Sequence, residues 1–263
     1  MNSGFAAGEG LWRARLGTLR QVVRQELVSL QLARHLPADR TAAVLDVGCG
    51  QGTQVLALAR AGHRVTGLDA SAALLSDLDS ALAREAPDVR ERVSLVRGDA
   101  TRLGELVPPR AFDAVLCHGV LMYLDDPGSL LTALAAAVAP VGLLSLLVRN
   151  GDALAMRPGL AGDWATALRA FDHMSYGNRI GVAARADRLA ALTSSLADRG
   201  LTIETWYGVR VFTDMADSDA PLPDQAEFRA LLDCEIVAGS TDPYRQVAAL
   251  LHVIGRSSDC GSS

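Results

Sequence analysis

Residues 46–52 read Asp-Val-Gly-Cys-Gly-Gln-Gly and join a short apolar, β-prone run to a segment with helical periodicity. Glycine has no Cβ and tolerates positive φ, so such a turn lets a ligand approach the backbone closely. The helix that follows would present unpaired N–H donors to that ligand. Alone, the pattern indicates only a nucleotide-like ligand, because similar loops hold NAD, FAD and other nucleotides.

The spacing within this loop narrows the kind of ligand. Gly48, Gly50 and Gly52 alternate, whereas sites for a dinucleotide pyrophosphate prefer Gly-x-Gly-x-x-Gly. Asp46 stands two residues before the first glycine, where a carboxylate would repel a pyrophosphate but suit a cationic group. The loop therefore disfavours a dehydrogenase.

Acidic residues also follow the next two predicted strands. Asp69, with Ala70 beside it, can accept hydrogen bonds from both hydroxyls of a ribose, each worth about 1.5–3 kcal/mol. Asp99 can accept from an adenine amino group, with Ala100 packing near the ring. Because the carboxyl ends of successive parallel strands converge on one crevice, these residues predict a site for an adenosine-containing cofactor.

The elements that position these residues alternate along the chain. Apolar, β-prone runs lie at 42–47, 64–69, 92–97, 112–117 and 142–148, with helical patterns at 53–61, 71–85 and 128–138. A helix at 187–199, a strand at 201–207 with an extension towards 212, a helix at 225–238 and a strand at 246–254 follow. This order predicts an α/β fold with a Rossmann-like, doubly wound sheet of seven mostly parallel strands.

Two segments fall outside the alternation. Residues 12–36 have helical periodicity, so residues 1–40 are predicted to form an N-terminal helical lid. Residues 151–185 combine glycines with aromatic and basic side chains, and predict an irregular or short-helical insertion that caps the active site. The core then comprises residues 41–150 and 186–256.

Composition is typical of a globular protein, with 49% hydrophobic and 21% charged residues. The longest apolar run, 133–148, contains a proline and a glycine and is too short to span a bilayer. The N-terminus lacks the pattern of a signal peptide. The four cysteines lie far apart without a histidine at ligand spacing, which predicts neither a disulfide framework nor a metal site. We expect a cytoplasmic protein without a membrane partner or a metal.

Charge is distributed unevenly along the chain. The net charge of −5 argues weakly against a nucleic-acid partner. Residues 1–40, however, carry six arginines against three acids, and residues 149–188 carry six against four. If these two segments meet in space, they form an anion-attracting face. Solvated helix faces are an equally good interpretation of the same charges.

At these residues the chain resembles the class I S-adenosylmethionine methyltransferases. More narrowly, it resembles the tRNA carboxymethoxyuridine methyltransferase family, which methylates the carboxylate of a modified wobble uridine. The matching segments beyond the glycine loop are 19–21, 117–121 with 126–127, 143–146 with Asn150, 160–162, 208–214, 242–244 and 252–253. The resemblance covers most of the chain and implies S-adenosylmethionine as the cofactor.

The resemblance also implies which residues hold that cofactor. The family's contacts carry over by motif position onto Arg20, Gly48, Cys49, Asp69, Asp99, Ala100 and His118. Asp46, Gly50, Gly52 and Ala70 complete the predicted cofactor set. Arg20 would reach the cofactor's methionine carboxylate, and His118 its adenosine or methionine end. The chain departs from the pattern at Cys49, which replaces a glycine, and at Arg149, where an aromatic residue commonly precedes the asparagine.

Methyl transfer from a sulfonium is an in-line displacement. A carboxylate acceptor needs no general base, and positioning alone can contribute about 7–11 kcal/mol. A hydroxyl acceptor would need a base, for which His118 is the candidate. Arg210 is predicted to clamp an anionic acceptor through two hydrogen bonds, with a surface ion pair as an even alternative. Tyr123, Asn150 and Tyr244 are predicted to line the acceptor site, with core packing the alternative for Tyr244.

Two other functions remain open from the sequence. The first is an O- or N-methyltransferase of a small metabolite, which the acidic net charge and Arg149 favour, with the insertion as a specificity cap. The second is a protein that binds S-adenosylmethionine without catalysis. The match at residues 208–214 favours tRNA as the acceptor. The pattern gives no indication of the oligomeric state.

Overall fold

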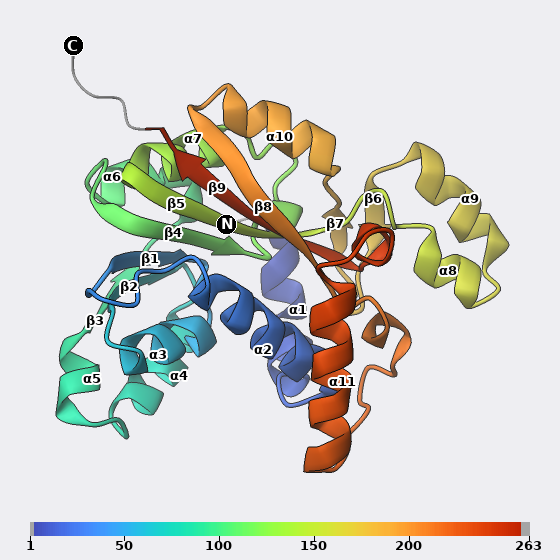
Figure 1. The fold of residues 1–263 in the computed structure, drawn as a ribbon, viewed down its shortest axis with the longest axis horizontal. Helices are drawn as coiled ribbons and strands as arrows, with labels where there is room; N and C mark the ends of the chain where they lie inside the picture. The colour runs from blue at the N-terminus through green and yellow to red at the C-terminus, as the bar shows by residue number, and fades with distance from the viewer. Residues whose placement is uncertain (1–2, 259–263) are drawn as a thin grey trace.

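One mixed sheet organises the computed structural model, which describes residues 3–258 and, of the side chains, those from residue 7 onward. Seven strands lie in the order β3-β2-β1-β4-β5-β9-β8 (Figure 1). The parallel strands are β1 (Ala43–Val47), β2 (Arg64–Asp69), β3 (Val93–Arg97), β4 (Phe112–His118) and β5 (Val138–Arg149). β9 (Leu250–Ser257) runs antiparallel to both β5 and β8 (Leu201–Val209). The predicted α/β fold with seven mostly parallel strands is confirmed.

Helices cover both faces of this sheet. One face is covered by α6 (Leu103–Leu106), α7 (Gly128–Ala137) and α10 (Leu189–Ala197). The other is covered by α2 (Leu19–Ala33), α3 (Thr53–Arg60), α4 (Ala72–Leu82) and α5 (Pro87–Glu91). Because both faces are covered, the central strands are almost continuously buried rather than alternating. Short 3₁₀ turns lie at η1 (Ala100–Arg102), η2 (Leu121–Tyr123), η3 (Thr213–Met215) and η4 (Tyr244–Val247).

The N-terminal region forms helices, as predicted, and these are two in number. α1 (Ser3–Ala14) ends before Gly17, and α2 begins after Thr18, whose hydroxyl donates to the carbonyl of Arg15 at 2.7 Å. The apolar stripe of α2 packs against the sheet through Val23 and Leu27. α11 (Gln225–Ala238), with the bounds predicted from the sequence, packs on the outer side of α2.

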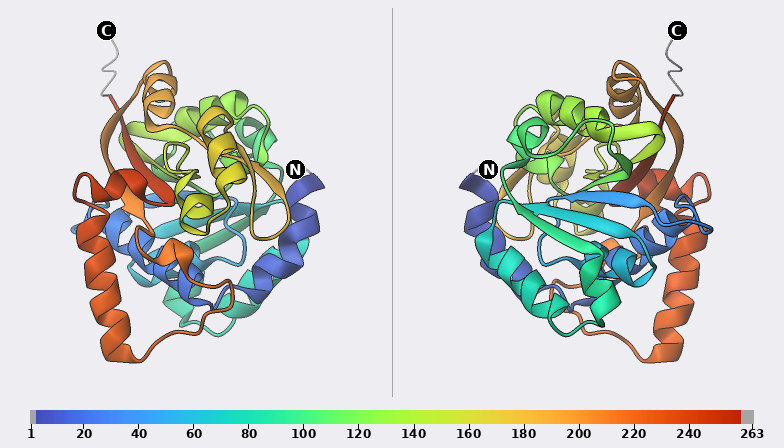
Figure 2. Two further views of the ribbon diagram at one scale, coloured as in Figure 1. Left: turned by 90° about the vertical axis from the view of Figure 1, so that its right-hand side faces the viewer. Right: turned by 90° about the vertical axis from the view of Figure 1, so that its left-hand side faces the viewer.

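The insertion is more regular than predicted. It contains α8 (Met156–Leu160), α9 (Trp164–Asp172) and a hairpin of β6 (Ser175–Gly177) and β7 (Ala183–Arg185). Figure 1 shows α8 and α9 projecting from one side of the molecule, with the hairpin between them and the sheet, and this side faces the viewer in the left view of Figure 2. Trp164 and Phe171 are 69% and 65% exposed on α9.

Within residues 3–258, no helix combines the length and hydrophobicity needed to cross a membrane. The same part of the chain holds no group of three or more His, Cys, Asp or Glu side chains arranged to bind a metal. Cys49 and Cys117 are buried free thiols and Cys234 is an exposed one. Cys260 lies outside the described residues.

Candidate active site

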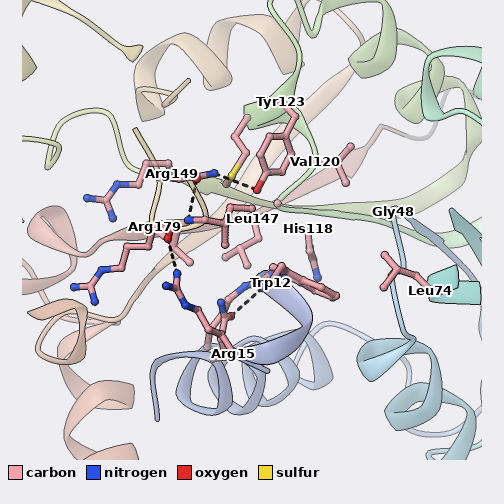
Figure 3. A pocket seen from close by; sticks show the side chains of 18 of the residues that line it. Trp12, Arg15, Gly48, Leu74, His118, Val120, Tyr123, Leu147, Arg149 and Arg179 are labelled. Carbon is pink, nitrogen blue, oxygen red and sulfur yellow. Dashed lines mark hydrogen bonds between the residues drawn. The ribbon is translucent and has the colours of Figure 1, made fainter. Parts of the chain in front are cut away.

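A pocket lies at the carboxyl ends of the parallel strands, where the strand order changes direction between β1 and β4. The predicted residues that line it are Arg20, Gly48, Gly50, Asp69, Ala70, Asp99, Ala100, His118, Tyr123 and Arg210. Figure 3 shows its two ends, with Gly48 and Leu74 on one side and Arg149 and Arg179 on the other. The glycine loop and the arginines thus share one cavity.

The glycine loop forms the floor of one end. Gly48 and Gly50 have φ of 74° and 57°, in the left-handed region that side chains disfavour. A Cβ on Gly48 would lie 2.3 Å from Val120, and one on Gly50 would lie 3.1 Å from the ring of Trp12. The bare backbone therefore allows the side chains of Val120 and Trp12 to approach the loop closely, and a side chain at either glycine would collide with them.

Asp69 is held at the edge of this floor. One carboxylate oxygen accepts from the Gly50 N–H at 2.9 Å and the other from the Ser71 N–H at 2.8 Å. Burial raises its pKa. A carboxylate has about four lone-pair sites, so acceptor capacity remains for a ligand's hydroxyl group. Asp99 caps η1 by accepting from the backbone and hydroxyl of Thr101 at 3.0 and 2.9 Å, beside Ala100.

Three of the predicted cofactor contacts lie behind the loop instead. The Cys49 side chain is 9% exposed, packs in the core and lies beside Gly67. A Cβ on Gly52 would meet Leu78 of α4 at 2.1 Å, so this glycine serves helix packing. Asp46 is 4% exposed and does not line the pocket. None of the three lines the pocket, and their contact with the cofactor stays a prediction.

Asp46→Asn should stabilise the cofactor-free protein increasingly as pH rises from 4 to 8. Burial first, then Asp69, raise the pKa of Asp46 from 3.8 to about 7, with Arg24 opposing. The unfolded chain therefore ionises before the folded protein does. The free energy of unfolding therefore falls by about 4 kcal/mol between these two pKa values, and it stays at the lower value at higher pH. Asparagine removes this penalty.

Thermal melts at pH 4, 6 and 8 would measure this effect. Asp79→Asn, a change of the same kind at an exposed position on α4, is the control. A difference between Asp46→Asn and wild type that stays constant with pH would contradict the assignment.

At the other end of the pocket, three arginines converge on Asp214. Arg20 contacts one carboxylate oxygen at 2.7 Å and Arg210 the same oxygen at 3.4 Å, while Arg149 contacts the other at 3.4 Å. Each of these four residues is at most 8% exposed. Burial alone would raise the pKa of Asp214, but the three guanidiniums hold it well below its ordinary value. Burial lowers the pKa of Arg210 to about 9, although Asp214 opposes this.

This cluster has positive charge in excess and unused donors. The Nε atoms of Arg20, Arg149 and Arg210 are buried without a hydrogen-bond partner. Buried polar groups are normally paired, so three unpaired donors in one pocket wall indicate the place of an anionic ligand. Arg149 also lies over the ring of Tyr176 of the insertion, 5.6 Å from its centroid.

The two basic segments meet in this pocket. Its lining includes Arg15, Arg20 and Arg24 from the N-terminal helices and Arg149, Arg157 and Arg179 from β5 and the insertion. Arg15 donates to the backbone carbonyl of Arg179 (Figure 3). The sequence predicted an anion-attracting face if these two segments meet in space, and the structure brings them together. The charge excess at 149–188 was the signal for Arg157 and Arg179, which the site prediction did not include.

A short loop carries both Arg210 and Asp214. β8 ends at Val209, rather than extending towards 212, because Arg210 has φ of 61° and turns the chain out of the sheet. The three N–H groups of residues 211–213 donate to the carboxylate of Glu235 at 2.8, 3.1 and 2.8 Å. Glu235 is 1% exposed on α11 and thereby anchors the loop. Sequence reasoning did not identify this residue.

Two predicted acceptor residues lie outside the pocket. Asn150 is 1% exposed, and its amide donates to the carbonyls of Gln246 and Ala248, both at 2.9 Å. It therefore ties the end of β5 to η4. Tyr244 is 52% exposed and contacts Phe212, with ring centroids 6.4 Å apart, so core packing is excluded as well. Neither residue lines the pocket, and their contact with the acceptor stays a prediction.

His118 and Tyr123 both line the pocket. His118 is the last residue of β4, and its Nε2 lies 2.9 Å from the Ser145 hydroxyl. Burial, and then His252 and Arg24, hold its pKa well below the ordinary value, so the ring is neutral. The Tyr123 hydroxyl accepts from the Asn178 amide at 3.4 Å, which joins η2 to the insertion.

Comparison with known proteins identifies the class. Residues 45–146 match the model of a methyltransferase domain. Residues 45–146 thus form a methyltransferase domain, and the chain has the Rossmann-like fold that solved S-adenosylmethionine-dependent methyltransferases share.

The individual relatives differ in what they act on. A tRNA 5-carboxymethoxyuridine methyltransferase of Escherichia coli is 28% identical over 251 residues, covering 91% of this chain and 90% of that protein. A ubiquinone biosynthesis O-methyltransferase of Paracidovorax citrulli is 35% identical over 120 residues, 45% of this chain and 48% of that protein. The structure of magnesium protoporphyrin IX methyltransferase from Synechocystis, with bound SAH, matches with a TM-score of 0.62 at 18% identity. That match covers 98% of this chain and 96% of the other.

Proposed function

We propose that this methyltransferase acts on the carboxylate of an anionic acceptor, namely a carboxylated wobble uridine in tRNA, and forms its methyl ester. The observation that carries the proposal is the cluster of three buried guanidiniums around the single carboxylate of Asp214, with three Nε donors unused. The similarity to a tRNA methyltransferase along nearly the whole chain supports the choice of acceptor. Such a substrate would place the protein in the cytoplasm.

The two ends of the pocket then have separate tasks. Bound S-adenosylmethionine would supply a methyl group on a positively charged sulfur. The backbone of Gly48 and Gly50 would carry the cofactor, Asp69 would accept from its ribose hydroxyls and Asp99 from its adenine. Arg20 already donates to Asp214 and retains its Nε for the methionine carboxylate. α1 and the β6–β7 hairpin would cover the pocket and exclude water from it.

Arg210 would hold the acceptor. A guanidinium can clamp a carboxylate through two parallel hydrogen bonds and so direct one oxygen along the line of displacement. No base is required, and His118 would be a weak one, because its pKa is held well below the ordinary value and its Nε2 is already engaged by Ser145. The contribution of the chain is orientation and charge stabilisation.

Arg210→Ala should spare cofactor binding and lose methyl transfer. Two charge-assisted hydrogen bonds account for about 3 kcal/mol or more, so kcat/KM should fall at least roughly a hundred-fold. Arg210→Lys should recover little, because an ammonium cannot form the fork. The assay is base-labile methyl ester formed on tRNA from a strain that lacks this protein. Arg169→Ala, exposed on α9, is the matched control, and normal turnover by Arg210→Ala would exclude the clamp.

A small metabolite is the second candidate acceptor. The similarity to a ubiquinone biosynthesis O-methyltransferase over about half the chain favours it, as does a pocket wall made by Tyr176 and Ile180 of the insertion. Labelled cofactor incubated with tRNA and with a metabolite extract would separate the two. Tight cofactor binding without transfer to either pool would instead indicate a non-catalytic binding protein.

A further inference from the structure

Four polar side chains form a continuous hydrogen-bonded row from α2, across the face of the sheet that α2 covers, to the pocket. Gln31 Oε1 lies 2.7 Å from His252 Nδ1, His252 Nε2 lies 2.8 Å from Ser145 Oγ, and Ser145 Oγ lies 2.9 Å from His118 Nε2. Gln31 is 4% exposed, and Ser145 and His252 are fully buried. The row ends at His118 Nδ1, which is buried without a hydrogen-bond partner in the wall of the pocket.

The first member of this row determines the position of every proton after it. An amide oxygen only accepts, so His252 carries its proton on Nδ1 and, when neutral, has a lone pair on Nε2. The Ser145 hydroxyl must then donate to His252, which leaves its oxygen to accept from His118. His118 therefore carries its proton on Nε2.

We propose that Gln31, His252 and Ser145 form a relay that fixes the tautomer of His118 and keeps the lone pair of Nδ1 facing the pocket as a permanent acceptor. Figure 3 shows the His118 side chain extending from the end of β4 towards Trp12 of α1. The three residues of the relay are positioning residues, since they act on a bound ligand only through His118.

Burial and nearby basic groups keep both histidine rings of the relay neutral. Burial, followed by the effect of His35, lowers the pKa of His252 to about 3. A protonated His252 would donate from both ring nitrogens, which would reverse the Ser145 hydroxyl and move the His118 proton to Nδ1. His118 in turn lies near His252 and Arg24, both of which oppose its protonation. Both rings thus remain neutral, and the direction of the row is preserved.

The relay limits what can lie beside His118. A lone pair at Nδ1 accepts from an ammonium or a hydroxyl group and disfavours a carboxylate oxygen. The acceptor's carboxylate must then approach from the Arg210 side, while Nδ1 faces a donor of the cofactor. This last step rests on the proposed function, whereas the tautomer does not.

The tautomers can be read directly by ¹⁵N NMR of the whole protein with labelled histidine. We expect opposite tautomers in the two rings, with the proton on Nε2 in His118 and on Nδ1 in His252. The two sets of signals would be assigned by their loss in His118→Gln and His252→Gln. A proton on Nδ1 of His118 in the wild-type protein would overturn the proposal, and no substitution in the relay is needed for this test.

Ser145→Val and Ser145→Thr provide a matched pair, because the two side chains have the same shape and differ only in the hydroxyl. The valine variant should populate both His118 tautomers and bind S-adenosylhomocysteine roughly tenfold more weakly, as expected for one lost hydrogen bond. The threonine variant should keep the wild-type tautomer and affinity. Equal affinities and unchanged tautomers in both variants would refute the relay. Neither measurement needs an acceptor, so a failure of the tRNA assay would leave this test unaffected.

Discussion

Asp69→Ala should abolish measurable binding of S-adenosylmethionine and of S-adenosylhomocysteine. The carboxylate is predicted to accept two ribose hydroxyls at about 1.5–3 kcal/mol each, so affinity should fall by roughly two to four orders of magnitude. The substitution also removes the acceptor for the N–H groups of Gly50 and Ser71, which fix the loop beside the ligand. Isothermal titration with S-adenosylhomocysteine measures the loss.

This substitution should reduce the stability of the fold much less than it reduces the affinity for the ligand. Burial raises the pKa of Asp69, and Asp69 in turn raises that of Asp46, so removing one carboxylate relieves repulsion in the cofactor-free protein. Asp69→Asn keeps one acceptor oxygen and should bind with intermediate affinity. Asp79→Ala, on the exposed side of α4, should bind as wild type. Wild-type affinity in Asp69→Ala would place the ribose elsewhere in the pocket.

The sheet and the glycine loop could be predicted because their signals are local. Strands covered on both faces are read as short apolar runs, and the alternating glycines mark a tight turn. The sheet confirms these runs, with boundaries that differ by a few residues. N-terminal helices were predicted, but the helical periodicity of residues 12–36 does not show the break near Thr18 that separates α1 from α2.

The direction of side chains at the ends of strands was not predictable in the same way. Arg149 and Asn150 are neighbours, yet only Arg149 faces the pocket, since successive residues of a strand point to opposite sides. The sequence predicts Asn150, and not Arg149, as a residue of the acceptor site. Arg210 lines the pocket, but its positive φ is a conformation that the identity of a non-glycine residue does not reveal.

The sequence pattern also does not identify two buried acidic residues. Asp214 and Glu235 look like surface residues in the sequence, because carboxylates are rarely buried unless they are paired. Their partners come from distant elements: Arg20 lies 194 residues from Asp214, and the N–H groups that hold Glu235 belong to a different loop. The uneven arginine distribution predicted an anion-attracting face in outline, but not the carboxylate that organises it.

Asp214→Asn should therefore have the largest effect on stability. It leaves three buried guanidiniums around an uncharged amide, and breaking a buried ion pair costs about 3–5 kcal/mol because the remaining charge is uncompensated. For a chain of this size the melting temperature should fall by roughly 10 °C. Asp217→Asn, exposed a few residues further along the same segment, should leave the melting temperature unchanged.

Restoring the charge balance should reverse the loss in two independent ways. Arg149→Met in the Asp214→Asn background removes one uncompensated cation and should recover part of the lost stability. Inorganic phosphate, added at constant ionic strength, should raise the melting temperature of Asp214→Asn more than that of wild type, because an anion binds the folded state of the variant more strongly. A melting temperature for Asp214→Asn equal to wild type, without any phosphate effect, would mean that the cluster carries no excess charge. The electrostatic basis of the proposed carboxylate acceptor would then be lost as well.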